Sequence, residues 1–179
     1  MPHVFAYGSN LDFDQMKRRC PSARVVGVAA LLGFRLAFAG RSARWRGAVA
    51  TVIKSPDNLV AGVIYEVNFR DLLRLDGFEG APRVYVRQPT FVRVLGTDLD
   101  VEVDTYVLDR RFGSPSREYV KTIARGFKRF GLDKKWLYNA VRFSRRRAAR
   151  QVEIEERNAR EYLAKLDANG WLASEPDRS

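Results

Sequence analysis

The chain has 179 residues, of which 46% are hydrophobic and 12% aromatic, so it can bury the core of one ordinary domain. A single cysteine and a single histidine exclude an internal disulfide, a cysteine-rich zinc site and a histidine-rich metal cluster. The net charge of +11 is uneven, because residues 110–179 carry 18 basic against 9 acidic side chains and residues 1–109 carry 14 against 12. No run of 18 apolar residues and no secretion signal are present, so we expect a cytoplasmic protein without a membrane segment.

The chain begins with a short strand and a short helix. The apolar run over residues 3–7 predicts a buried strand that breaks at Gly8. Asp12 and Gln15 have the spacing of a capping box, which predicts a helix that stops before Pro21.

Longer strands follow. The apolar stretch over residues 25–39 predicts a strand bent at Gly33, which suits a curved sheet. Two further apolar runs, 48–53 and 59–67, flank the turn-forming residues 55–58 and predict a hairpin.

A helix and a second hairpin come next. Asn68 is placed to cap a short amphipathic helix that we expect to end at Gly77. The apolar runs 84–95 and 101–108 then bracket the turn at 96–98 and predict a second hairpin.

The last third of the chain predicts helices. Helical patterning begins at Ser116, breaks at Gly131 and resumes in a long helix over about 144–168, which places five residues on one stripe: Val152, Ala159, Tyr162, Leu163 and Leu166. The pattern predicts an α+β fold in which helices pack against a small, strongly curved mixed sheet or barrel. We expect residues 1–143 to form this domain and residues 144–179 a basic helical extension, packed on it or projecting from it.

Two segments stand out as candidate site elements. The first, which we call the N-terminal loop, consists of Tyr7, Gly8, Ser9, Asn10 and Leu11. A glycine turn at a helix start leaves backbone N–H groups that can converge on an anion such as a carboxylate. An ordinary strand-to-helix turn is the alternative.

The second segment contains Glu79, which lies between Gly77 and Gly80 beside Phe78. A carboxyl group held against apolar surface has a raised pKa, in the range useful for general acid–base catalysis. A solvated loop glutamate is the alternative for this residue taken alone.

Together the two segments resemble the γ-glutamylcyclotransferase family. The family motif YGSNL matches Tyr7–Leu11, and about 70 residues later the pattern LDxxEG matches Leu75–Gly80. Further matches over residues 4–143 follow in the family's order, and they include Trp45 and Gly47 of a W-x-G-x-x-A-T stretch, Gly62–Tyr65, Tyr85, Tyr106, Ser114–Pro115 with Tyr119, and Gly126 with Gly131.

The resemblance implies an activity and roles for residues. Family members release 5-oxoproline from a γ-glutamyl amide when the substrate's own α-amine attacks the γ-carbonyl, without metal or cofactor. Glu79 would then be the general acid and base. The N-terminal loop would bind the glutamyl carboxylate or polarise the amide carbonyl, and Tyr85 and Tyr119 would line the pocket. Core packing is an equal alternative for Tyr119 and the favoured interpretation for Tyr106.

Two other functions stay open. Five arginines over residues 142–150 could bind nucleic acid or another polyanion without catalysis: Arg142, Arg145, Arg146, Arg147 and Arg150. The favoured interpretation is a solvated helix face whose charges pair with Glu153, Glu155 and Glu156. A γ-glutamyl intermediate of a specialised biosynthetic pathway is a further candidate substrate. The predicted partner is a small γ-glutamyl compound, with no membrane, and a homodimer is left open.

Overall fold

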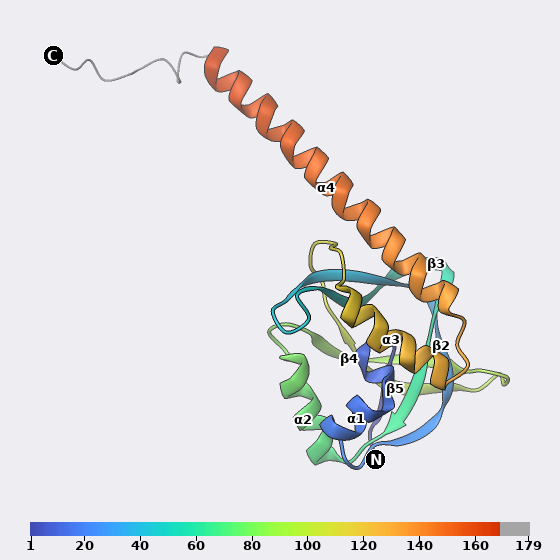
Figure 1. The fold of residues 1–179 in the computed structure, drawn as a ribbon. Coiled ribbons are helices and arrows are strands. Elements are labelled where there is room, and N and C mark those ends of the chain that lie inside the picture. Colours follow the sequence, from blue (N-terminus) through green and yellow to red (C-terminus); the bar gives the residue numbers. More distant parts are fainter. Residues whose placement is uncertain (169–179) are drawn as a thin grey trace.

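Five strands close into a barrel in the computed structural model, which describes residues 1–168 (Figure 1). Around the barrel the order is β1-β3-β2-β4-β5; β1 and β5 run parallel and all other neighbours antiparallel. The strands are β1 (His3–Ala6), β2 (Arg24–Ser42), β3 (Gly47–Glu66), β4 (Val86–Val94) and β5 (Asp100–Val107). Four α-helices and one short 3-10 helix accompany them, so the expected α+β fold with a small closed sheet is confirmed.

Three of the helices begin where the sequence predicts a capping residue. The helices are η1 (Ser9–Leu11), α1 (Phe13–Arg19), α2 (Phe69–Glu79), α3 (Arg117–Arg129) and α4 (Lys134–Ala168). Asp12 accepts a hydrogen bond of 2.9 Å from the backbone N–H of Gln15, as the capping-box spacing predicts. Asn68 and Ser116 cap α2 and α3 in the same way.

The first predicted hairpin is wrong, because residues 48–53 and 59–67 belong to one long strand, β3, and both pair with β2. The register runs from Phe34 opposite Lys54 to Leu32 opposite Leu59, so residues 55–58 lie at an irregularity opposite Gly33. Their turn chemistry therefore makes a local protrusion rather than a chain reversal, and proline is tolerated because it stands outside the paired ladder. The second hairpin, β4 with β5, is confirmed.

The predicted end of α2 is also wrong. The helix continues through Gly77 and ends at Glu79, and Gly80 caps it in the left-handed conformation with φ 65°. Glycine is the residue that adopts this conformation without steric cost, whereas at Gly77 nothing in the backbone requires a stop. Glu79 is consequently the last helical residue and not a loop residue.

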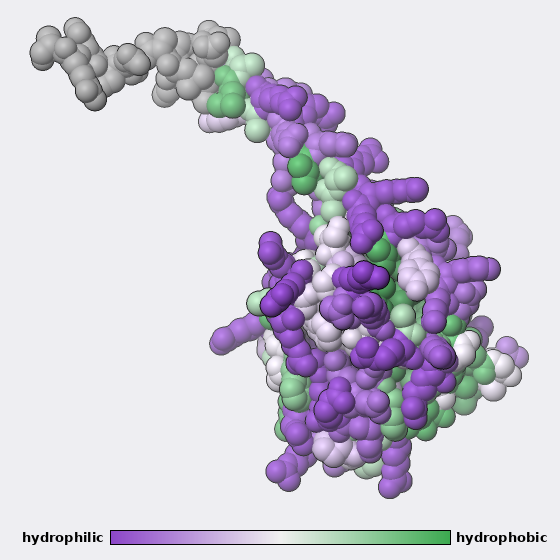
Figure 2. Space-filling view, viewed as in Figure 1, coloured by the Kyte–Doolittle hydropathy of each residue, from purple (hydrophilic) through white to green (hydrophobic). Residues whose placement is uncertain are grey.

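The long C-terminal helix begins earlier than predicted, at Lys134 instead of about 144. Its first part packs on the barrel, where the Ser144 hydroxyl accepts a hydrogen bond of 2.8 Å from the Phe38 backbone. Beyond that it projects away from the body (Figure 1), and the stripe residues Val152, Tyr162 and Leu163 are exposed on this mainly hydrophilic part (Figure 2). The side chain of Leu166 lies outside the described residues, and a domain division at 143/144 stays a prediction.

Helix α3 packs directly on the N-terminal loop. A Cβ atom on Gly126 would lie 2.4 Å from the Leu11 Cβ, so only glycine allows this approach. Leu11 is fully buried beneath the helix. The loop that follows β1 is thereby fixed between the barrel end and α3. No helix among residues 1–168 is long and apolar enough to cross a membrane.

Candidate active site

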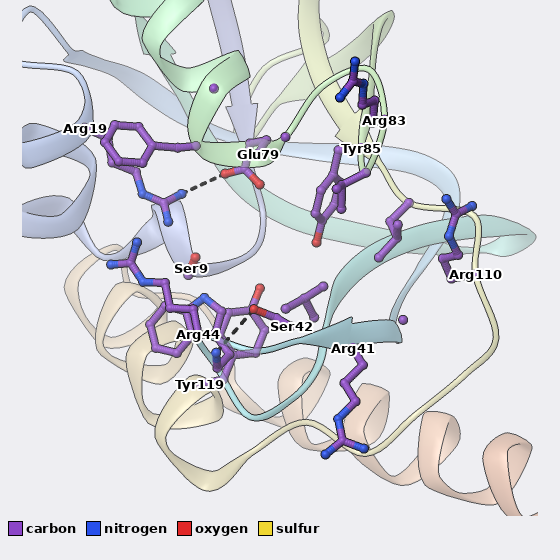
Figure 3. Close-up of a pocket in the computed structure, with 18 residues that line it drawn as sticks. Ser9, Arg19, Arg41, Ser42, Arg44, Glu79, Arg83, Tyr85, Arg110 and Tyr119 are labelled. Atoms are coloured by element: carbon purple, nitrogen blue, oxygen red, sulfur yellow. Dashed lines mark hydrogen bonds and ion pairs between the residues drawn. The ribbon is translucent and has the colours of Figure 1, made fainter.

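The structure brings the two predicted segments together. The Asn10 side-chain amide donates a hydrogen bond of 3.0 Å to Glu79 Oε1, although 69 residues separate them in the chain. Asn10 lies in η1, just after β1, and Glu79 is the last residue of α2. Figure 3 shows the position of Glu79. The carboxylate and the N-terminal loop therefore form one site.

Arg19, which the sequence did not single out, completes this cluster. It is the last residue of α1, and its Nη1 lies 2.8 Å from Glu79 Oε1 (Figure 3). The same Nη1 lies 2.9 Å from Asn10 Oδ1. Its guanidinium also stacks on the Phe78 ring at 5.1 Å. A basic residue in the last turn of a helix is so common that its position alone gives no sign of a site.

The Glu79 side chain is 14% exposed. Burial raises the pKa of this carboxyl above its usual value, and the Arg19 charge and the Asn10 hydrogen bond offset part of that rise. The group is thus held where its proton affinity exceeds that of an ordinary glutamate, as proton transfer near neutral pH requires.

Two tyrosines hold the backbone of one residue, Ala50 in β3. The Tyr85 hydroxyl donates to the Ala50 carbonyl at 2.7 Å, and the Tyr119 hydroxyl accepts from the Ala50 N–H at 3.1 Å. Burial raises the pKa of Tyr119 to about 12, so its hydroxyl keeps its proton. Ala50 does not use that proton, and the Ser9 side chain lies within hydrogen-bond reach of the same hydroxyl group.

Tyr7 and Tyr106 form a second pair. The Tyr7 hydroxyl donates to the backbone carbonyl of Tyr106, and burial raises the pKa of Tyr7 well above its usual value. The Tyr106 hydroxyl in turn donates to Asp76 at 2.8 Å, and its ring is buried. Tyr106 is therefore part of the buried core, as the favoured sequence interpretation expects, and it also lines a small recess beside the N-terminal loop.

The N-terminal loop offers backbone donors and little free space. The N–H groups of Leu11 and Asp12 donate to the carbonyls of Gly8 and Ser9 and so close the turn. The N–H groups of Ser9 and Asn10 donate to no acceptor among residues 1–168. Gly8 has a negative φ, so backbone strain is not the reason for a glycine. A Cβ atom there would instead lie 3.1 Å from the Ala50 Cβ and 3.5 Å from the Tyr119 hydroxyl.

A cavity of about 490 Å³ opens over these groups (Figure 3). It continues into a recess of about 30 Å³ between the N-terminal loop and the tyrosines, and four residues line both: Ser9, Glu79, Tyr85 and Tyr119. Trp45 lines the outer part, with its ring 4.8 Å from that of Tyr119. The arrangement suits a narrow polar group inside and a variable group outside.

Residues 4–129 match the protein family described as gamma-glutamyl cyclotransferase, AIG2-like. The chain belongs to this family.

Named relatives agree with that membership. The chain is 34% identical over 138 residues to the gamma-glutamylcyclotransferase of Mus musculus. The aligned region covers 74% of this chain and 73% of the relative. The chain is 36% identical to the Bos taurus gamma-glutamylcyclotransferase over 135 residues, and this alignment covers 72% of this chain and 71% of the relative. A solved structure named gamma-glutamyl cyclotransferase superposes with a TM-score of 0.72 at 31% identity, over 78% of this chain and 85% of that one.

The match ends at residue 129, so the arginines of residues 142–150 lie outside the cyclotransferase region. Arg145, Arg146 and Arg150 are exposed on α4, and Arg147 stacks on Phe143 at 5.5 Å. None of them lines the cavity. Polyanion binding by this helix stays a separate, untested prediction.

Proposed function

We propose that the protein is a γ-glutamylcyclotransferase in which Glu79 is the general acid and base. The observation that carries the proposal is the Glu79 carboxylate, buried in the cavity wall with a raised pKa and bonded to the N-terminal loop. Family membership and the named relatives support the reaction class. The products would be 5-oxoproline and a free amine or amino acid.

The reaction needs proton transfers at two nitrogen atoms. Glu79 takes a proton from the substrate's α-ammonium group, and the free amine attacks the γ-carbonyl to close a five-membered ring. The bond between the γ-carbon and the departing nitrogen then breaks as Glu79 returns the proton to that nitrogen. A second proton passes the same way from the ring nitrogen, so the amine leaves fully protonated and Glu79 ends as a carboxylate.

The N-terminal loop and Tyr119 supply the groups that hold the glutamyl part. The unused N–H groups of Ser9 and Asn10 can bind the α-carboxylate or the oxygen that becomes negative during attack. The Tyr119 hydroxyl, whose proton Ala50 does not use, can donate to the same oxygen. Tyr85 closes the recess, and the departing amine extends into the larger cavity. No metal or cofactor takes part in this scheme.

The test is release of 5-oxoproline from γ-glutamyl amino acids, γ-glutamyl amines and glutathione. We expect turnover of at least one compound and a loss of about 10²-fold or more in Glu79→Gln, because the amide cannot accept or return a proton. Glu102→Gln on the exposed face of β5 is the matched control and should keep parent activity. Absence of turnover with every compound, or parent turnover in folded Glu79→Gln, contradicts the proposal.

A further inference from the structure

Positive charge dominates the walls of the large cavity. Glu79 is the one carboxylate among its lining residues. Five arginines line it as well: Arg19, Arg41, Arg44, Arg83 and Arg110. Glu79 is already paired with Arg19. Four positive charges around this opening are therefore without a compensating acid in the wall itself.

These four arginines also lack acidic partners elsewhere. Within residues 1–168 none of them forms an ion pair, and Arg110 donates through Nη1 only to the backbone carbonyl of its neighbour Asp109. Arg87 in β4 differs from them, since it forms ion pairs with both Asp76 and Asp104. The four guanidinium groups around the cavity are therefore without an acidic partner among the described residues.

The free guanidinium groups approach the opening from separate loops. Arg44 belongs to the turn between β2 and β3 and lies on the Arg19 side of the cavity, with its guanidinium 5.6 Å from the Trp45 ring (Figure 3). Arg83 and Arg110 follow α2 and β5 and lie on the opposite side, beyond Tyr85 (Figure 3). Arg41 points away from Glu79 in this view.

Arg44 is close enough to act on the reacting groups. Its charge is among the influences that lower the proton affinity of Glu79, after burial, Arg19 and Asn10. A group that leaves the recess past Glu79 therefore enters a field set by Arg44 on one side and by Arg83 and Arg110 on the other. Positively charged cleft walls concentrate anions and repel cations.

We infer that the departing amine of the substrate carries a second carboxylate beside the α-carboxylate of a simple amino acid, as in a γ-glutamyl dicarboxylic amino acid. This inference rests on the proposed cyclotransferase function. Guanidinium groups bind carboxylates through paired hydrogen bonds, and three unpaired arginines around a cavity of about 490 Å³ can take two such groups. Arg44, Arg83 and Arg110 are then the specificity-determining residues.

The discriminating substrates are γ-glutamyl-glutamate, γ-glutamyl-glutamine and γ-glutamyl-lysine, which differ in the charge of one side chain. We expect kcat/KM to be about tenfold higher for the glutamate than for the glutamine compound, and lowest for the lysine compound. Raising the salt concentration should narrow the gap between glutamate and glutamine, because the arginines are exposed and their charges are screened.

Variants assign the effect to the cavity. Arg44→Gln, Arg83→Gln and Arg110→Gln should each lower the glutamate-to-glutamine ratio of kcat/KM several-fold. The triple variant should bring this ratio close to one. Arg146→Gln on α4 removes the same charge away from the cavity and should leave the ratio unchanged.

The outcomes separate the two levels of the argument. Release of 5-oxoproline with an equal or higher kcat/KM for the glutamine or lysine compound overturns the inference and leaves the cyclotransferase function standing. A preference for the glutamate compound that survives the triple variant also overturns it. Failure to release 5-oxoproline from any γ-glutamyl compound overturns the proposed function itself.

Discussion

Arg19 and Glu79 are the last residues of two different helices, and their side chains meet at 2.8 Å. A cation is favoured at the C-terminal end of a helix and a carboxylate is not, so the pair compensates an unfavourable position of Glu79. Because Arg19 bonds Asn10 as well, it ties the end of α1 to both candidate segments. We assign it as a positioning residue for the carboxylate.

The Arg19 assignment predicts a change in pH dependence. The Arg19 charge is the main influence that opposes the raised pKa of Glu79, so Arg19→Gln should raise that pKa further. Glu79 must be ionised to accept the first proton, and the acidic limb of the kcat/KM profile should therefore move to higher pH. Arg19→Lys keeps a positive charge and should restore part of the shift.

A purely structural role for Arg19 would give another result. In that case Arg19→Gln would lower activity or melting temperature equally at every pH, with the acidic limb in its parent position. Measuring the pH profile and the melting temperature of the parent and both variants separates the two roles.

The Tyr119 hydroxyl should matter for both stability and turnover. Tyr119→Phe leaves the buried Ala50 N–H without an acceptor, which should lower the free energy of unfolding by about 1–3 kcal/mol. It also removes the hydroxyl that we propose as a donor to the reacting oxygen, so kcat should fall more than KM rises. Denaturant unfolding and steady-state kinetics test this, with exposed Tyr138→Phe as the control. Parent kcat in folded Tyr119→Phe would show that the residue only packs.

Gly8 should tolerate no larger side chain without loss of binding. A Cβ atom already lies 3.1 Å from the Ala50 Cβ, so Gly8→Val should push the loop out of place and raise KM about tenfold or more for any γ-glutamyl substrate. Gly8→Ala should give a smaller effect in the same direction. At Gly27 the nearest atom to an added Cβ is 3.9 Å away, so Gly27→Ala serves as the control. Normal binding by Gly8→Val would make the N-terminal loop an ordinary turn.

The basic residues of α4 should not affect turnover. Changing Arg145, Arg146 and Arg147 together to glutamine should leave 5-oxoproline release within a few-fold of the parent, because none of them lines the cavity. Any affinity for DNA or RNA should be weak and steeply lost between low and physiological salt. Tight binding that survives physiological salt and collapses in the triple variant would instead support the polyanion-binding alternative. Both quantities are measured on the same two protein samples.

The sequence predicted the parts of the site that depend on local chemistry. The N-terminal loop and the region of Glu79 were found because each carries glycines and polar residues in a recognisable pattern, and the caps at Asp12 and Asn68 follow from spacing alone. Arg19 was missed because its role arises only when the ends of α1 and α2 pack together. No local pattern distinguishes it from other arginines in a last helical turn.

The errors in predicting the fold from the sequence have similar causes. Residues 55–58 carry turn chemistry, but β2 is long enough to pair with the chain on both sides of them, so tertiary pairing prevailed over the local signal. Gly77 and Gly80 are equivalent as helix terminators in the sequence. The choice between them follows from the left-handed conformation at Gly80, where the chain leaves the helix.

The end of α2 also bears on how such enzymes diverge. Glu79 is placed by a helix, its glycine cap and the barrel-bound N-terminal loop, whereas Arg44, Arg83 and Arg110 stand on connecting segments at the surface. Surface connections accept substitutions and insertions that packed elements do not. Mutation can therefore replace the preferred departing group while the proton-transfer machinery stays in place, so a shared YGSNL and LDxxEG signature marks common chemistry and leaves each member's substrate to be decided by its loops.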